Sequence, residues 1–431
     1  MSRFLNSKTF VLKSLALTVT ALMVTTANAA TSDQEEIKQL RQEVEALKAL
    51  VQQQQQVQQQ QQVKLQEVAT QPAAPQSPLA SLKSKTGADV NLYGFIRGDA
   101  NYIIEGADDD FNKVSSSDGQ TKDKLRATAK TTRIGLDFTA PVADAKVGGK
   151  IEVDFAGNGA SENLRIRHAY LTYNNWLFGQ TTSNFLSSHA PEMIDFNTNV
   201  GGGTTRIPQV RYNYKLAPST DLFVALEEGN SSAKYKETVD GKSVESEDIK
   251  YTLPVLTAKV TQGYAGGNGK ASGRVFVENY KSEATSDNQT GWGIAIGTDF
   301  KVIEPLKLFA DASYVVGNSN YLYGSNSAYS VVNGDIEQNE FTALQVGGTY
   351  KILPNLRTTL AYGALFADDG TDFAKANKAA NEKVQQGWLN VIYSPAKPLD
   401  LGVEYVNGKR ETFEGKSFKD NRVGLMAKYN F

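Results

Sequence analysis

The side chains in this sequence with a clear chemical capacity are arginines that alternate with apolar residues. Arg165 and Arg167 share one face of a predicted strand, and Leu164 and Ile166 share the other. A guanidinium group stays charged at any relevant pH and binds carboxylates through two parallel hydrogen bonds. Comparable positions occur on other predicted strands, so the candidate residues for anion binding and selectivity are Arg97, Arg133, Arg165, Arg167 and Arg211.

Little in the sequence points to catalysis. There is no Cys and there are only two His, which excludes disulfides and thiolate metal sites. Ser187-Ser188-His189 lacks the spaced acid and the nucleophile turn of a hydrolase. Asp108-Asp109-Asp110 is expected to be a solvated loop, with a weak surface Ca²⁺ site as the alternative. We expect no enzyme activity, cofactor or metal, and the formal net charge of −2 does not suggest a nucleic-acid partner.

The elements that must position the arginines are β-strands, because apolar and polar residues alternate from Asp89 to Phe431. Most of the segments are long enough to cross hydrocarbon as tilted strands, which takes about 9–11 residues. Sixteen segments are predicted, near 90–104, 131–140, 146–157, 163–174, 175–182, 206–215, 220–228, 251–264, 270–281, 290–301, 306–317, 339–351, 355–366, 385–394, 398–408 and 420–431.

The connections between these segments alternate in length. Short turns contain Pro141, Asn174-Asn175, Pro218, Pro305, Pro354 and Pro395. Long polar stretches lie between them, at 105–130, 182–205, 229–250, 318–338, 367–384 and 409–419. An even strand count with short turns at one end and long loops at the other is typical of a bacterial outer-membrane barrel. We therefore predict an all-β, 16-stranded antiparallel transmembrane barrel.

The cost of placing charges in lipid decides which face of each strand is turned inward. Lys or Arg on the lipid face near the bilayer midplane costs roughly 2–4 kcal/mol. Several such residues would exceed the ~5–15 kcal/mol stability of an ordinary domain, so the charged faces must line the lumen. His168 shares the face of Leu164, Ile166 and Tyr170, and we expect a neutral imidazole at a subunit interface or at the rim.

The loop from Ser183 to Thr205 is predicted to fold inward and narrow the bore. Phe185, Met193, Ile194 and Phe196 would anchor it, and Gly201–Gly203 would let it return to the wall. The residues expected to form the constriction are Phe185, Glu192, Asp195 and Phe196, with both acids opposite the arginines.

Two alternatives remain for this part of the chain. The loop could lie outside as a surface loop. The arginines could pair with Asp99, Asp137, Glu152 and Asp154 on the same inner face and serve only to solvate the wall. We favour a net positive constriction, because Arg165 and Arg167 have no acid on their own strand.

The sequence before the barrel divides into three parts. Residues 1–29 have the basic head, apolar segment and Ala27-Asn28-Ala29 site of a secretory signal peptide. Residues 30–69 carry apolar residues at alternating spacings of three and four, followed by a Gln-rich tract, which predicts a short coiled coil. Residues 70–87 are a Pro-rich linker, and the barrel is predicted over 88–431.

These features resemble those of the DcaP-like family of outer-membrane porins. The resemblance rests on the coil with its Gln run, the Pro linker, the opening segment Asn91–Asp99 and the terminal Tyr429-Asn430-Phe431. It implies a homotrimer of 16-stranded barrels with periplasmic coils, passing small dicarboxylates and related anions.

The residues and the resemblance together predict a porin of the bacterial outer membrane. Its expected partners are small anionic solutes, outer-membrane lipid and further copies of itself, and the coiled coil could contact peptidoglycan. The alternative is a structural or adhesive barrel tethered to the cell envelope by its coil. A bore plugged by its own loops, with no conductance, would favour this alternative.

Overall fold

The structure is a computed structural model, and it describes residues 82–83, 87–157, 162–239, 242–323 and 326–431. The chain forms two units, residues 1–80 and Ser81–Phe431. The predicted signal peptide, the coiled coil and most of the linker lie outside the described residues. One part of the predicted linker is a short strand, β1 (Leu82–Lys83), which pairs with residues Val90 and Asp89.

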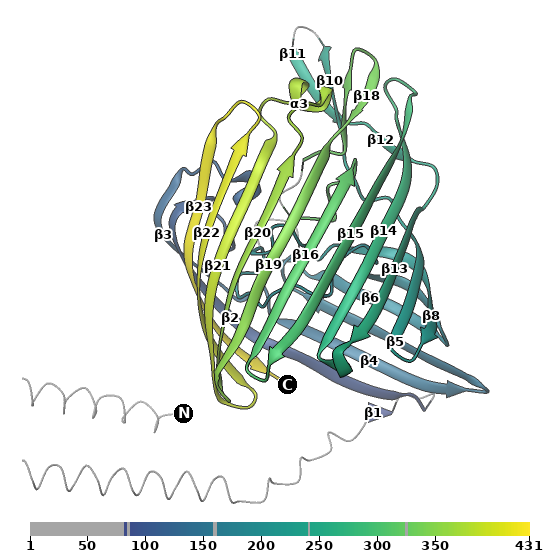
Figure 1. Cartoon of the computed structure of the whole chain (residues 1–431), viewed down its shortest axis with the longest axis vertical. Helices are drawn as coiled ribbons and strands as arrows, with labels where there is room; N and C mark the ends of the chain where they lie inside the picture. Colours follow the sequence, from purple (N-terminus) through teal and green to yellow (C-terminus); the bar gives the residue numbers. More distant parts are fainter. Residues whose placement is uncertain (1–81, 84–86, 158–161, 240–241, 324–325) are drawn as a thin grey trace, which may run out of the picture. The chain divides into compact units, whose positions relative to one another are not determined.

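The second unit is a closed antiparallel barrel of sixteen strands, as the alternation predicted. Figure 1 shows its strands tilted side by side, with β14 to β23 across the front. The wall strands are β2 (Asp89–Gly106), β3 (Thr121–Thr128) with β4 (Arg133–Val142), β5 (Ala145–Asp154), β6 (Arg165–Tyr173), β7 (Trp176–Thr182), β8 (Arg206–Ala217), β9 (Thr220–Glu227), β12 (Ile249–Tyr251) with β13 (Val255–Tyr264), β14 (Gly269–Ser282), β15 (Asn288–Ile303), β16 (Leu306–Val316), β19 (Glu340–Leu353), β20 (Leu356–Ala367), β21 (Asn381–Ala396), β22 (Leu399–Thr412) and β23 (Ser417–Asn430).

Two wall positions are shared by two strands each. β3 and β4 pair in turn with the two halves of β2, and β12 and β13 both pair with β14. β3 was predicted to be part of a loop, because its residues Thr121–Thr128 are mostly polar and carry no apolar alternation. β2 pairs with β23, from Phe95 opposite Asn430 to Glu105 opposite Asn421, and this contact closes the barrel.

Short turns join the strands at one end of the barrel, where the C-terminus also lies (Figure 1). The opposite end carries the longer connections, with the hairpins β10 (Lys234–Val239) with β11 (Lys242–Glu247) and β17 (Tyr329–Val332) with β18 (Asp335–Gln338), and the helix α3 (Asp372–Ala376). The prediction of a long loop at 409–419 is wrong. β22 and β23 run on to Thr412 and from Ser417, paired from Glu411 opposite Ser417, so only a tight turn remains.

The outer face of the barrel is apolar and exposed. Ile96, Ile296 and Leu360 are 61%, 69% and 65% exposed, although a soluble protein would bury such side chains. A continuous apolar outer surface is what lipid requires of a transmembrane strand. No helix among the described residues is long and apolar enough to cross a bilayer.

A β-bulge in β6 changes which way its side chains point. Glu152 lies opposite His168 and Val153 opposite Ile166, so Arg167 is an extra residue on β6. Beyond the bulge the alternation is reversed, and His168 shares the face of Glu152, with its Nδ1 2.9 Å from Thr181 Oγ1. The prediction that His168 faces outward is therefore wrong, because a strict two-residue period does not survive an inserted residue.

Candidate functional site

The loop formed by residues 183–205 is fastened to inner-face side chains of the barrel wall. At its start, the Ser183 hydroxyl donates to Glu227 at 2.7 Å. The Ser187 hydroxyl donates to Asp311 at 2.6 Å. His189 Nδ1 lies 2.6 Å from Asp299, and burial keeps the pKa of this imidazole low, although Asp299 opposes the effect. The first third of the loop is thus held by carboxylates of β9, β15 and β16.

The middle of the loop meets β20, β21 and β22. Glu192 makes two 2.8 Å hydrogen bonds with the guanidinium of Arg357. The buried Glu404 carboxylate accepts the backbone N–H groups of Ile194 and Asp195, each at 2.8 Å. Backbone donors buried without water need such acceptors, so Glu404 fixes the position of this segment.

The end of the loop contacts β19, β20 and β21. Gln345 donates to Asn199 at 2.7 Å, and the N–H of Val200 donates to Gln386 at 3.3 Å. The backbones approach so closely that only glycine fits, because a Cβ on Gly363 would lie 1.8 Å from the Val200 carbonyl oxygen.

Of the four residues predicted to form the constriction, the two aromatic residues pack against side chains of the barrel, and the two acids bind other partners than the predicted arginines. Phe185 is buried, with its ring 4.7 Å from that of Phe276 and 5.3 Å from that of Tyr321. Phe196 lies under the guanidinium of Arg97, 4.5 Å from its carbon. The prediction that Glu192 and Asp195 face the five arginines is wrong, because their partners are elsewhere: Glu192 binds Arg357.

Asp195 is buried and faces another loop rather than the arginines. Its carboxylate accepts the backbone N–H groups of Asn112 and Asn197 at 2.8 and 2.9 Å. Burial raises the pKa of Asp195 to about 6, with Arg422 opposing the shift.

Four of the five predicted arginines are paired with acids. Arg97 binds Asp99 on its own strand, at 2.6 Å, beneath the 183–205 loop. The other three share the two carboxylates of β5, Glu152 and Asp154. Arg165 and Arg167 have no acid on their own strand, but the neighbouring strand β5 supplies both of their acids.

The group on β4, β5 and β6 still has more positive than negative charge. Arg167 lies 2.9 Å from Glu152 and 2.8 Å from Asp154. Arg165 lies 2.7 Å from Asp154 and its side chain is 41% exposed, while Arg133 lies 3.4 Å from Glu152. Three guanidinium groups therefore share two carboxylates.

Arg211 is the fifth predicted arginine, and it differs from the rest. Among the residues that the structure describes, no carboxylate lies within ion-pairing distance of Arg211, and its Nε is buried without a hydrogen-bond partner. Its guanidinium carbon lies 5.8 Å from the centre of the Phe223 ring, on the next strand. Lys259 on β13 shares that ring, with its Nζ 5.5 Å from the centre.

Lys259 was not among the residues predicted from the sequence. The alternation of Val255, Thr257, Lys259 and Thr261 against Leu256 and Val260 places it on the inner face, and this signal was available. What was not available was its neighbour, because Lys259 lies directly opposite Phe223 only once β9 and β13 have paired. Arg206, the first residue of β8, is a further base that has no ion pair in the described part of the chain.

The three consecutive aspartates form ion pairs at the end of β2. Asp108 binds Lys124 at 2.7 Å, Asp109 binds Lys113 at 2.7 Å, and Asp110 binds Lys130 at 2.6 Å. Burial alone would raise the pKa of Asp110, but Lys130 and Arg126 outweigh it and hold the pKa below its usual value. This favours the predicted solvated, ion-paired loop over a cation site.

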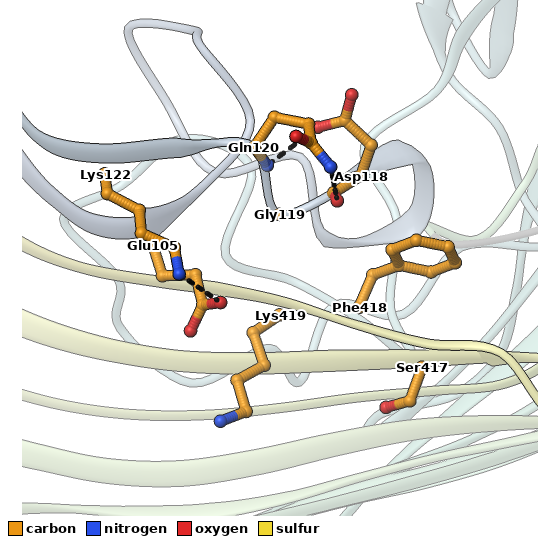
Figure 2. Close-up of a pocket in the computed structure, with 8 residues that line it drawn as sticks. All are labelled: Glu105, Asp118, Gly119, Gln120, Lys122, Ser417, Phe418 and Lys419. Carbon is orange, nitrogen blue, oxygen red and sulfur yellow. Dashed lines mark hydrogen bonds and ion pairs between the residues drawn. The ribbon is translucent and has the colours of Figure 1, made fainter.

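A cavity of about 420 Å³ is lined by residues from the end of β2, the segment Asp118–Gln120, β3 and β23 (Figure 2). Figure 2 shows Lys122 reaching toward Glu105, at 3.6 Å, with Phe418 and Lys419 on the facing strand. Acids and bases are mixed in its lining, so it offers no net charge to a solute.

A closed barrel with an apolar outer face, a charged inner face and a loop fastened inside it defines an outer-membrane channel of the porin class. A family model described as DcaP outer membrane protein matches residues 17–431. The chain belongs to the DcaP outer membrane protein family, and the resemblance noted in the sequence is confirmed.

Solved structures agree with this assignment. The crystal structure of the outer membrane channel DcaP of Acinetobacter baumannii is 72% identical, covers 82% of this chain and 100% of that chain, and has a TM-score of 0.77. OmpT of Vibrio cholerae (14% identity, 82% and 100% coverage, TM-score 0.51) and an anion-selective porin from Comamonas acidovorans (13%, 80% and 100%, 0.51) share the fold alone. No curated protein matches the chain.

Proposed function

We propose that this protein is a passive diffusion channel of the outer membrane that prefers small anions, dicarboxylates in particular. The observation that carries the proposal is the charge on the inner wall from β4 to β13. Three arginines share two carboxylates there, and Arg211 and Lys259 have no acid partner among the described residues. Fixed positive charge in a confined, water-filled bore concentrates anions and lowers their barrier to entry.

The 183–205 loop supports the proposal from the other side of the lumen. Its contacts run from Glu227 to Glu404, so it covers the inner faces of β14 to β22. Its own acid Glu192 is neutralised by Arg357. We infer that the loop narrows the bore toward the basic wall, with Glu192 paired to Arg357 and Asp195 buried against backbone N–H groups.

The wider assembly is part of the same proposal. We infer a homotrimer, with the coiled coil of residues 30–69 in the periplasm, where it could contact peptidoglycan. A trimer form is known for OmpT of Vibrio cholerae, which shares the fold. Crosslinking of the full chain in native membranes would test both the number of copies and the contact with the cell wall.

The main test is electrical recording from the purified protein in a planar bilayer under a KCl gradient. We expect a zero-current potential of the sign that marks chloride preference at neutral pH. Preference for potassium would refute the proposal. A barrel that conducts no ions would instead favour the structural or adhesive alternative.

A further inference from the structure

Two lysines lie directly opposite each other on the outer face of the barrel, near the end that carries the longer connections. Lys409 of β22 is paired in register with Lys419 of β23, and both side chains are exposed. They point outward because Tyr405 on β22 and Leu425 on β23, which share their parity, belong to the exposed apolar face. Like charges directly opposite on one face of a sheet repel. An anion bound against this pair would relieve the repulsion.

The ammonium of Lys419 has no ion pair or hydrogen bond in the part of the chain that the structure describes. Acids on the neighbouring positions already have bases of their own. Glu411 lies 3.4 Å from Lys409, and Glu105 lies 3.6 Å from Lys122. Lys419 therefore keeps all its donors for a partner from outside the chain.

The cavity of about 420 Å³ adjoins this pair of lysines. Lys419 lines it together with Gln120, Lys122 and Ser417. Figure 2 shows the side chain of Lys419 extending away from Asp118, which lines the same cavity. Amide, hydroxyl and ammonium groups are thus available in one hollow beside the two lysines, as the polar headgroup of a lipid requires.

The outer face of β22 and β23 becomes apolar in a fixed order below the lysines. The successive outward-facing pairs are Asn407 with Asn421, Tyr405 with Val423, and Val403 with Leu425. The two amides are joined by a 3.0 Å hydrogen bond. Successive pairs on one face are about 7 Å apart along the strands. Cations, amides, an aromatic ring and aliphatic side chains therefore follow one another from the rim toward the middle of the membrane.

We propose that this face binds an anionic lipid whose phosphate groups lie close to its acyl chains. The phosphate binds the ammonium groups of Lys409 and Lys419 through charged hydrogen bonds, and the rest of the headgroup enters the cavity beside Lys122. The acyl chains lie against Val403 and Leu425. The order of cation, amide and apolar wall matches the order of phosphate, polar linkage and hydrocarbon in such a lipid.

The position of the face in the membrane identifies the leaflet that supplies the lipid. The longer connections of an outer-membrane barrel are extracellular, so Lys409 and Lys419 lie at the level of the outer-leaflet headgroups. A free phosphate ion would use only the two lysines and leave the apolar part of the face without a partner. The site lies outside the barrel wall, and it is independent of the lumen and of the proposed channel function.

The experiment counts the lipid bound to the purified full-length protein by native mass spectrometry during titration with lipid A, a phosphorylated glycolipid. Combined Lys409→Gln and Lys419→Gln should weaken the binding about tenfold or more, and Lys419→Arg, which keeps the charge, should change it less than about twofold. The matched control is Lys146→Gln combined with Lys215→Gln. It removes the same charge from exposed lysines at the other end of the barrel and should leave lipid A binding unchanged.

Three further measurements decide between the possible occupants of this face. Lipid A without its phosphate groups should bind the wild type as weakly as lipid A binds the double variant, and excess inorganic phosphate should not displace lipid A. Equal binding of lipid A by the wild type and the double variant, or full displacement by inorganic phosphate, would overturn the proposal. A double variant that loses its oligomeric state but no lipid would also overturn it, because the face would then contact a second copy. Ion selectivity in the bilayer should be the same in both proteins, so failure here leaves the proposed channel function untouched.

Discussion

The two halves of the inner wall use the same kinds of residue with different results. Under the 183–205 loop, bases and acids are matched: Arg274 binds Asp311 at 2.6 Å and Arg357 binds Glu192 at 2.8 Å. On the half from β4 to β13, Arg211 and Lys259 have an aromatic ring for a neighbour. The covered half holds the loop in place, and we propose that the open half acts on solutes. The role of a charged residue on the inner face thus depends on whether the 183–205 loop covers it.

The largest effect is expected from breaking a matched pair in the covered half. Arg274→Met leaves the buried Asp311 charge without its guanidinium partner, which should destabilise the barrel by about 3–5 kcal/mol. Denaturant unfolding in detergent, followed by tryptophan fluorescence, measures the change. The double variant Arg274→Met with Asp311→Leu should recover much of the loss, since no buried charge then remains. An unchanged midpoint in Arg274→Met would show that the pair is not buried as described.

The next effect concerns selectivity on the open half. Combined Arg211→Gln and Lys259→Gln should lower the chloride-to-potassium permeability ratio roughly fivefold, because an unscreened charge close to the path contributes about 1 kcal/mol. Arg165→Gln combined with Lys150→Gln removes the same charge from side chains that have acid partners. If both double variants shift the zero-current potential equally, the distinction between paired and unpaired bases does not hold.

A third prediction concerns how the stability of the protein depends on pH through Asp195 in the 183–205 loop. The folded-state pKa of Asp195, about 6, lies above its usual value, so the folded protein takes up a proton that the unfolded chain does not. Stability should therefore rise as the pH falls from 7 through 6, by at most about 3 kcal/mol. Asp195→Asn should make this rise smaller. A wild-type stability that falls over the same range would contradict the assignment.

The smallest effect is expected at the 107–120 connection. Asp108 and Asp110 have lowered pKa values, Asp108 chiefly through its hydrogen bond with Lys124, so their ion pairs should persist at neutral pH and be lost only as the pH falls below about 4. Lys124→Gln removes an exposed pair and should leave the free energy of unfolding nearly unchanged. Limited proteolysis at pH 7 and pH 3 measures the release of the loop. Equal cleavage at both values would show that the ion pairs do not hold it.

The alternation of apolar and polar side chains predicted most of the barrel correctly. Where a prediction from this alternation was wrong, the structure shows the cause. The alternation placed all five arginines on strands, and Arg97, Arg133 and Arg211 lie on the inner parity without any irregularity. It failed at His168, because one inserted residue in β6 reverses the parity beyond it. It failed at 409–419, because polar residues in strands that extend beyond the apolar belt resemble a loop.

The second kind of wrong prediction concerned which acid pairs with which base. Pairing of the arginines with Glu152 and Asp154 was the less favoured alternative, and which arginines these acids bind depends on the register of β5 against β6. Glu192 was placed opposite the first strands, yet the loop crosses to β20 and binds Arg357. Contacts of this kind join residues far apart in the sequence, and a local pattern holds no information about them.

The sequence by itself determined that this chain forms strands, that those strands close into a barrel with lipid outside, and that bases are turned inward, because the cost of a charge in hydrocarbon leaves no other arrangement. Only the tertiary structure decided which of those bases are neutralised. That depends on strand register and on the path of one loop, since an ion pair needs two side chains within a few ångströms and not merely on the same face.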